Sequence, residues 1–214
     1  KVMTFLILMV LPPLSLSLAE KGLTIDQVLT GLEKKYAQQS FEARFEQLTT
    51  MAALGLEDRS SGNVWFSYPG KMRWQYLLPH HHEYITDGKV LWFYQPLEKQ
   101  VQVGDAEQAF KNGAGGTFLS DFSKVRSNFT STIVSQTEKE IRIRMIPRQP
   151  DPSVSAIEIQ VLKPKFIIRQ VTTWNQQEDT TLFVFRDLHF AESHPAMFSF
   201  NPPEGTVIIN NQQP

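Results

Sequence analysis

The histidine cluster His80-His81-His82 is the first candidate for chemistry in this sequence, because imidazole nitrogens bind transition metals. Consecutive residues of an extended segment point in alternating directions, so at most two of these rings can reach one ion. The chain contains no cysteine, and no paired aspartate stands nearby to complete a tetrahedral site. We therefore expect no metal site, and a solvated loop after Pro79.

The sequence patterns of common catalytic and nucleotide-binding sites are absent. There is no Gly-x-Ser-x-Gly motif, P-loop or dinucleotide fingerprint, and the glycine run 113–116 lacks the Lys-Ser/Thr that binds phosphate. The lack of cysteine excludes disulfides and thiol nucleophiles. A net charge of −1 gives no support to a nucleic-acid partner. We expect a protein that is not an enzyme, with no catalytic residues and no cofactor.

Aromatic and methionine side chains recur on particular faces of the expected strands, and these faces are the candidate binding surface. By strand parity the sets are Val64, Phe66 and Tyr68; Met72, Trp74 and Tyr76; and Trp92 and Tyr94. A packed core is one interpretation of such residues. Large rings and a flexible methionine also suit a surface that accepts variable apolar shapes. We interpret these side chains as the wall of an apolar cavity.

The candidate binding residues are expected to lie on β-strands. β-type runs cover residues 41–46, 63–68, 71–76, 84–86, 89–94, 141–145, 157–161, 166–174 and 181–190, with turn residues between the runs. Asp87-Gly88 between two such runs predicts a type I′ hairpin. Evenly spaced strands of this kind predict one large antiparallel sheet or barrel in a single domain.

Two helical segments interrupt the strands. Thr24 and Gln27 form a capping-box pattern before an apolar stripe made by Ile25, Val28, Leu29, Leu32 and Tyr36. A second, shorter helix with an apolar face is expected from Phe118, Leu119, Phe122 and Val125, as far as Arg126. Each stripe must be buried against another element, and the concave face or open mouth of the curled sheet is the natural place. Ile25, Val28, Leu29, Leu32, Phe118, Leu119 and Phe122 are therefore expected to form a lid.

The first residues have the features of an export signal. Lys1 precedes an apolar stretch that ends at Ser17-Leu18-Ala19, and a basic start, a short apolar region and a small-x-small site are typical of a secretory signal peptide. A retained membrane anchor is the alternative, but Pro12-Pro13 interrupts the run, which is shorter than the roughly 20 residues that span a bilayer. We expect residues 1–19 to be a signal peptide and residues 20–214 to be one soluble domain.

Five motifs stand in a fixed order along the chain: Phe41–Gln47, Gly62–Phe66, Pro69–Tyr76 with Pro79, Thr86–Pro96 and Phe198–Gly205. In these motifs the sequence resembles the periplasmic outer-membrane lipoprotein carrier (LolA) family. The resemblance in the order of elements covers essentially the whole mature chain. It implies a mainly β fold with a helical lid, an incomplete (half-open) antiparallel β-barrel covered by short α-helices. That family pattern often has an arginine before the turn proline, where Tyr68 stands here. Tyrosine lacks the charge and the five donors with which arginine would latch the lid.

The resemblance also implies a function. The expected protein is a monomeric periplasmic chaperone that binds the acyl chains of lipoproteins in an apolar cavity. It would shuttle them from an inner-membrane lipoprotein-releasing transporter to an outer-membrane receptor or membrane acceptor. A lipid- or glycolipid-binding or lipoprotein-sensing protein of the same fold is the alternative, and a secreted hydrolase with an unrecognised site is a third hypothesis.

Overall fold

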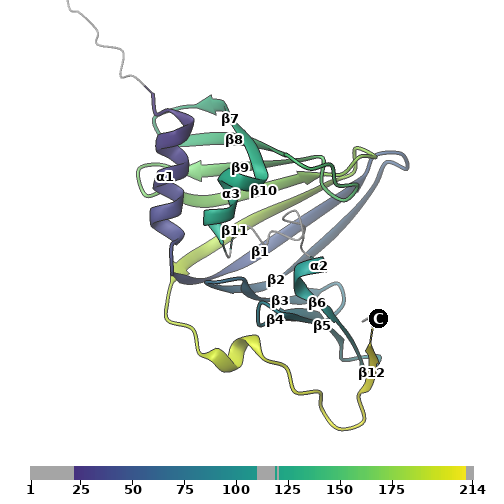
Figure 1. Ribbon diagram of the computed structural model, residues 1–214. Coiled ribbons are helices and arrows are strands. Elements are labelled where there is room, and N and C mark those ends of the chain that lie inside the picture. The colour runs from purple at the N-terminus through teal and green to yellow at the C-terminus, as the bar shows by residue number, and fades with distance from the viewer. Residues whose placement is uncertain (1–21, 110–118, 120, 211–214) are drawn as a thin grey trace, which may run out of the picture.

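The computed structural model describes residues 22–109, 119 and 121–210 (Figure 1). The signal peptide expected over residues 1–19 and the lid residue Phe118 lie outside these ranges. Among the described residues, no helix is both long enough and apolar enough to cross a membrane.

The described chain forms one strongly bent sheet of twelve strands in the order β12-β6-β5-β4-β3-β2-β1-β11-β10-β9-β8-β7. All neighbouring pairs are antiparallel except β12 and β6, and the end strands β7 and β12 do not pair with each other. The strands are β1 (Ser40–Met51), β2 (Leu56–Ser67), β3 (Lys71–Leu78), β4 (His82–Thr86), β5 (Val90–Gln95), β6 (Gln100–Asp105), β7 (Phe129–Gln136), β8 (Glu140–Pro147), β9 (Ala156–Leu162), β10 (Ile167–Trp174), β11 (Thr180–Phe190) and β12 (Val207–Asn210). The prediction of an incomplete antiparallel barrel is confirmed.

Alternating side chains give the sheet one buried and one partly exposed face along most strands. In β3, Met72, Trp74 and Tyr76 are buried, whereas the residues between them are partly exposed. The buried side chains of β1, β2, β3 and β8 to β11 join one apolar cluster, which fills the concave, or inner, face. The sheet is thus built from half-buried strands whose period-two pattern fixes which side chains face inward.

The turn between β4 and β5 differs from the expected type I′ hairpin. Three residues, Asp87 to Lys89, connect the strands, and of these only Gly88 has a positive φ, 96°. The Asp87 carboxylate accepts hydrogen bonds from the backbone N–H groups of Lys89 and Val90. The hairpin itself is confirmed, but a type I′ turn has positive φ at two successive central residues of a two-residue loop.

Helix α1 (Ile25–Tyr36) lies across the β7–β11 half of the sheet (Figure 1). The predicted capping box is present, since the Thr24 hydroxyl accepts from Gln27 N–H and the Gln27 side chain accepts from Thr24 N–H. At the other end the buried Tyr36 hydroxyl accepts from the backbone N–H of Ile168 in β10 at 2.9 Å. Gly31 allows the helix to approach closely, because a Cβ there would stand 2.6 Å from the Phe166 ring.

The remaining helical segments are short: α2 (Ala106–Ala109), the 3₁₀ turns η2 (Phe122–Lys124) and η3 (Pro195–Phe198), and α3 (Val125–Asn128). The predicted second helix is therefore a 3₁₀ turn followed by a single α-helical turn that ends two residues beyond Arg126. The segment after β11 carries η3 past the outside of β3 to β6, where β12 pairs with β6 (Figure 1). Its Phe198 is buried, and its Phe200 ring lies 4.8 Å from the Tyr94 ring.

Candidate functional site

Cross-strand pairing decides which aromatic residues share the inner face. Val64 of β2 pairs with Trp74 of β3, Trp74 with Tyr84 of β4, and Tyr84 with Phe93 of β5. Directly opposed residues of antiparallel strands point to the same face. These four side chains therefore form one row across the inner face.

A cavity of about 320 Å³ lies beside this row. It is lined by Gln47, Met72, Trp74, Tyr76, Tyr84, Ser153, Val154, Thr173, Thr181 and Phe183. The lining comes from β1, β3, β4, β10 and β11, and from the loop that precedes β9. The cavity volume is near the lower end of the roughly 300–1,000 Å³ typical of small-molecule sites.

Aromatic rings form one wall of the cavity. The Trp74 ring centroid lies 4.8 Å from that of Phe45 and 5.0 Å from that of Phe183. Tyr76 stacks on His82 at 4.3 Å, with an interplanar angle of 12°. Edge and stacked contacts of this kind hold large rings in fixed positions. The wall is therefore rigid on the side of β1, β3 and β11.

The polar part of the lining is neutral. The Tyr76 hydroxyl donates to Gln47 Oε1 at 2.7 Å, and Gln47 Nε2 donates to Thr49 Oγ1 at 3.0 Å. Burial raises the pKa of Tyr76 and of Tyr84, so both phenols keep their protons. The described residues that line this cavity include no acidic or basic side chain. A bare charge entering it would lose its hydration without gaining a partner, so the cavity favours uncharged ligands.

Among the described lining residues, Trp74 carries the one fully buried side-chain donor or acceptor without a hydrogen-bond partner. Its side chain is 3% exposed, and its indole Nε1–H has no acceptor there. Leaving a buried donor unpaired costs about 1–3 kcal/mol. Trp65 on the neighbouring strand faces the other way and donates to Glu42 Oε2 at 2.6 Å. The sheet thus provides a hydrogen-bond acceptor for the outer indole N–H and none, among the described residues, for the inner one.

The lid helices pack on the same inner face through apolar contacts. Val28, Leu29 and Leu32 of α1 are buried in the inner-face cluster, and Ile25 packs against it. Leu119 and Phe122 are buried there too, and the Phe122 ring stacks on Tyr36 at 5.0 Å. The structure places these lid residues over the sheet as expected from their spacing.

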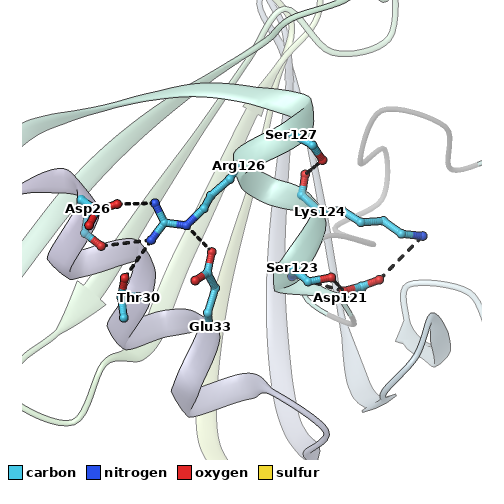
Figure 2. Close-up of polar contacts among 8 residues, drawn as sticks. All are labelled: Asp26, Thr30, Glu33, Asp121, Ser123, Lys124, Arg126 and Ser127. Carbon is cyan, nitrogen blue, oxygen red and sulfur yellow. Dashed lines mark hydrogen bonds and ion pairs between the residues drawn. The ribbon is translucent and has the colours of Figure 1, made fainter.

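Arg126 ties the two lid helices together by polar contacts (Figure 2). From α3 its Nε donates to Glu33 Oε1 at 2.6 Å, its Nη1 to Asp26 Oδ1 at 2.5 Å, and its Nη2 to Thr30 Oγ1 at 2.8 Å. These hydrogen bonds, that to Glu33 first, raise the pKa of the guanidinium above its usual value. Arg126, the last residue of the predicted second helix, therefore fastens α1 to α3, a polar role that the sequence did not predict.

The expected cavity residues divide into three groups. Met72, Trp74 and Tyr76 line the cavity. Val64 and Phe66 lie on the same face but are packed into the apolar cluster behind the cavity wall. Tyr68 follows the last residue of β2 and is 39% exposed. It belongs neither to the cavity lining nor to the apolar cluster.

The expected positions of Trp92 and Tyr94 are corrected by the pairing of β4 with β5. Trp92 pairs with Ile85 and Tyr94 with Glu83, so both point to the outer face, and Phe93 points inward. Every residue of β5 is partly buried, because the segment after β11 covers part of its outer face. The aromatic run from Trp92 to Tyr94 has no polar residue to mark its parity.

Sequence reasoning missed the polar and loop parts of the lining. Gln47, Tyr84 and Phe183 lie on strands whose alternation was recognised, so extending the parity from Phe45 would have placed Gln47. Ser153 and Val154 lie in the proline-rich loop before β9, which is anchored to the β10–β11 turn by a 3.4 Å bond from Gln176 N–H to Pro152 O. No local pattern predicts that this loop folds over the inner face.

No histidine is among the described lining residues of the cavity, although His82 stacks on the lining residue Tyr76. Among the described residues, no group of three or more His, Asp or Glu side chains could hold a metal ion. His81 Nε2 lies 3.4 Å from Glu83 Oε1, and His82 Nδ1–H donates to the backbone carbonyl oxygen of His80 at 3.0 Å. Burial against Tyr76 and its neighbours lowers the pKa of His82.

Comparison with known proteins places the chain in a family. The family model described as "Outer membrane lipoprotein carrier protein LolA" matches residues 37–201. Outer-membrane lipoprotein carrier proteins of Nitrosomonas europaea and Pectobacterium carotovorum are 25% and 26% identical, over 80% and 81% of this chain and 83% of each relative. The crystal structure of an uncharacterized conserved protein from Thermus thermophilus has the same fold, with a TM-score of 0.59 at 10% identity over 87% of this chain and 98% of that one. The chain therefore belongs to the outer membrane lipoprotein carrier protein LolA family.

Proposed function

We propose that this protein is a periplasmic chaperone that binds the acyl chains of lipoproteins and carries them from an inner-membrane transporter to the outer membrane. The observation that carries the proposal is the neutral, ring-walled cavity on the inner face of the sheet. Membership of the carrier family supplies the cargo class, since the relatives are named outer-membrane lipoprotein carrier proteins. Residues 20–214 would be the carrier domain, following a signal peptide over residues 1–19.

The energetics of acyl chains explain why such a carrier needs an enclosed site. Each methylene group removed from water is worth about 0.8 kcal/mol, so a long chain crossing an aqueous compartment needs an apolar sheath. Trp74, Phe183 and Met72 offer that surface. Binding here needs no covalent chemistry, and the protein would act as a carrier and not as an enzyme.

The size of the cavity implies that the lid moves. At about 320 Å³ the cavity is at the small end of ligand sites, whereas a lipoprotein anchor carries several long chains. Helices α1 and α3 pack over the inner face and are joined by Arg126, so their displacement would enlarge the site. We propose that cargo replaces these apolar contacts and that their return favours release.

Mass spectrometry of the ligand tests the proposal. The protein is produced with its export segment, purified from the periplasm under mild conditions, and its bound material is extracted. We expect a peptide-linked, acylated anchor. A glycolipid or a free lipid as the sole ligand would support the alternative of a lipid-binding protein of this fold, and repeated recovery without any lipid would contradict both. A variant with Trp74→Glu serves as the unloaded control.

A further inference from the structure

The unpaired indole of Trp74 identifies the polar part of the ligand. Trp74 lines the cavity, its side chain is 3% exposed, and its Nε1–H has no acceptor among the described residues. Buried donors in proteins are almost always paired, with protein, with water or with a ligand. The orphan donor belongs to a residue of the cavity wall, and Nε1 itself is covered by neighbouring side chains. A ligand that displaces these side chains on entering the cavity is therefore expected to pair with it.

Neighbouring polar groups on the inner face do not supply that partner. The Tyr76 hydroxyl is committed to Gln47 Oε1 at 2.7 Å, and the Tyr36 hydroxyl accepts from Ile168 N–H at 2.9 Å. Rings of Phe45, Phe66 and Phe183 surround the Trp74 indole and offer no acceptor of comparable strength. By contrast, the indole N–H of Trp65 has an acceptor, because it donates to Glu42 on the outer face.

The charge of the lining limits what the acceptor can be. Among the described residues that line the cavity there is no Lys, Arg or His, so a carboxylate or phosphate would find no counter-charge on them. A neutral carbonyl oxygen accepts one hydrogen bond from an indole at no such cost. Ester and amide carbonyls are the neutral acceptors found next to the acyl chains of lipids.

We infer that Trp74 Nε1–H donates a hydrogen bond to the ester or amide carbonyl of a bound acyl chain, which makes Trp74 a specificity-determining residue for linked acyl chains over free fatty acids. The inference rests on the proposed function, because it assumes that acyl chains occupy this cavity. The aromatic wall binds the chain, and the indole N–H fixes where the chain joins its headgroup. Ligands without a carbonyl at that place bind through the apolar wall alone.

Paired lipids test the inference. Binding of a 1,2-diacylglycerol, which has ester carbonyls, is compared with that of a 1,2-dialkylglycerol of equal chain length, which has ether oxygens only. We expect the ester lipid to bind about 5- to 10-fold more tightly to the unaltered protein. In Trp74→Phe the ratio should fall to within about 2-fold, and Trp65→Phe, which alters the outer face, should leave it unchanged. The free fatty acid of the same length should bind more weakly than the ester.

The outcomes separate the inference from the function on which it rests. Equal affinities for the ester and ether lipids, or a preference that survives in Trp74→Phe, would overturn the role of Trp74 and leave the acyl site intact. Failure of both lipids to bind would contradict the proposed function and the inference with it. In NMR spectra of ¹⁵N-labelled protein, the indole resonance that disappears in Trp74→Phe should shift with the ester lipid and not with the ether. A loss of structure alone would not produce that difference.

Discussion

Trp65 and Trp74 lie on neighbouring strands of one sheet and face opposite sides. Their indole N–H groups differ in whether they have a hydrogen-bond acceptor. The outer indole donates to Glu42, whereas the inner indole has no partner among the described residues and stands in the wall of a cavity. The same residue type is thus used once to complete the protein's own hydrogen bonds and once to leave a donor for a ligand.

The rest of the two faces repeats this difference. On the outer face, Arg73 and Gln75 both donate to Glu83, whose side chain is 7% exposed, and Arg73 also donates to Met197 O at 3.4 Å. On the inner face the strands present rings, a methionine and neutral hydroxyls around empty space. The polar groups of the outer face are thus paired within the protein, whereas the inner face combines the apolar core with the proposed binding cavity.

The largest expected effect comes from placing a charge on the inner face. Trp74→Glu should weaken acyl-lipid binding by at least about 100-fold, because the carboxylate would be buried where the described lining residues offer no cation. Trp92→Glu makes the same substitution on the outer face and should bind nearly as well as the unaltered protein. Lipid titration followed by intrinsic fluorescence, with circular dichroism to verify folding, measures both. Equal losses in the two variants would remove the distinction between the faces.

Breaking the outer-face network should affect stability and not binding. Glu83→Ala leaves Arg73 and Gln75 without their shared acceptor and should lower the free energy of unfolding by about 2–3 kcal/mol. The value is below that for a fully buried pair, since the Arg73 side chain is 25% exposed. Urea unfolding measures it, and Arg44→Ala, which removes an exposed pair with Asp187, should leave the midpoint nearly unchanged. A Glu83→Ala protein of full stability that no longer bound lipid would reverse the assignment.

Loosening the lid should change rates more than affinity. Arg126→Ala removes the bonds to Asp26, Thr30 and Glu33 and should speed lipid release about 2- to 5-fold, with less hydrogen-exchange protection in α1. Arg142→Ala is the matched control, because Arg142 lies 3.9 Å from both Glu140 and Glu158 and touches no lid helix. Unchanged release in Arg126→Ala would show that the apolar contacts of Phe122 and Leu32 hold the lid without help.

The smallest expected effect is a pH dependence at the edge of the aromatic wall. Burial lowers the pKa of His82 below its ordinary value of 6.5, so in acid the unfolded chain takes up the proton before the folded one. Stability should therefore fall by less than about 1 kcal/mol as the pH drops below about 6.5, and His82→Phe should remove this part of the loss.

His189 provides the control of opposite sign. Its pKa is raised, first by the backbone carbonyl of Asp187 and then by Glu42, so it contributes stability below pH 6.5 that is lost as the pH rises through its folded-state pKa. His189→Asn should therefore steepen the acid-side loss of stability. Thermal unfolding midpoints at pH 7.5 and 5.5 compare the two variants, and the same sign of change in both would refute the assignment of His82.

Much of the fold follows from local pattern, because alternation in β3 and the stripe of α1 each define a face without reference to the rest of the chain. Met72, Trp74 and Tyr76 were predicted on the inner face for that reason. The positions of Trp92 and Tyr94 were wrong because every residue of β5 is partly buried and the aromatic run from Trp92 to Tyr94 has no charged or amide residue to mark its parity. Ser153 and Val154 reach the cavity only through the tertiary path of a loop. The hydrogen bonds of Arg126 also join segments about 100 residues apart, which no local pattern reports.

Photo-crosslinking with an acylated lipoprotein that carries a diazirine in its acyl chain tests the central claim most directly. After irradiation and proteolysis, mass spectrometry locates the modified residues. We predict crosslinks on the inner face, at Met72 or Trp74 in β3 and at Phe183 in β11. Crosslinks confined to the outer face, at Trp92 or at the segment around Phe198, would contradict the account.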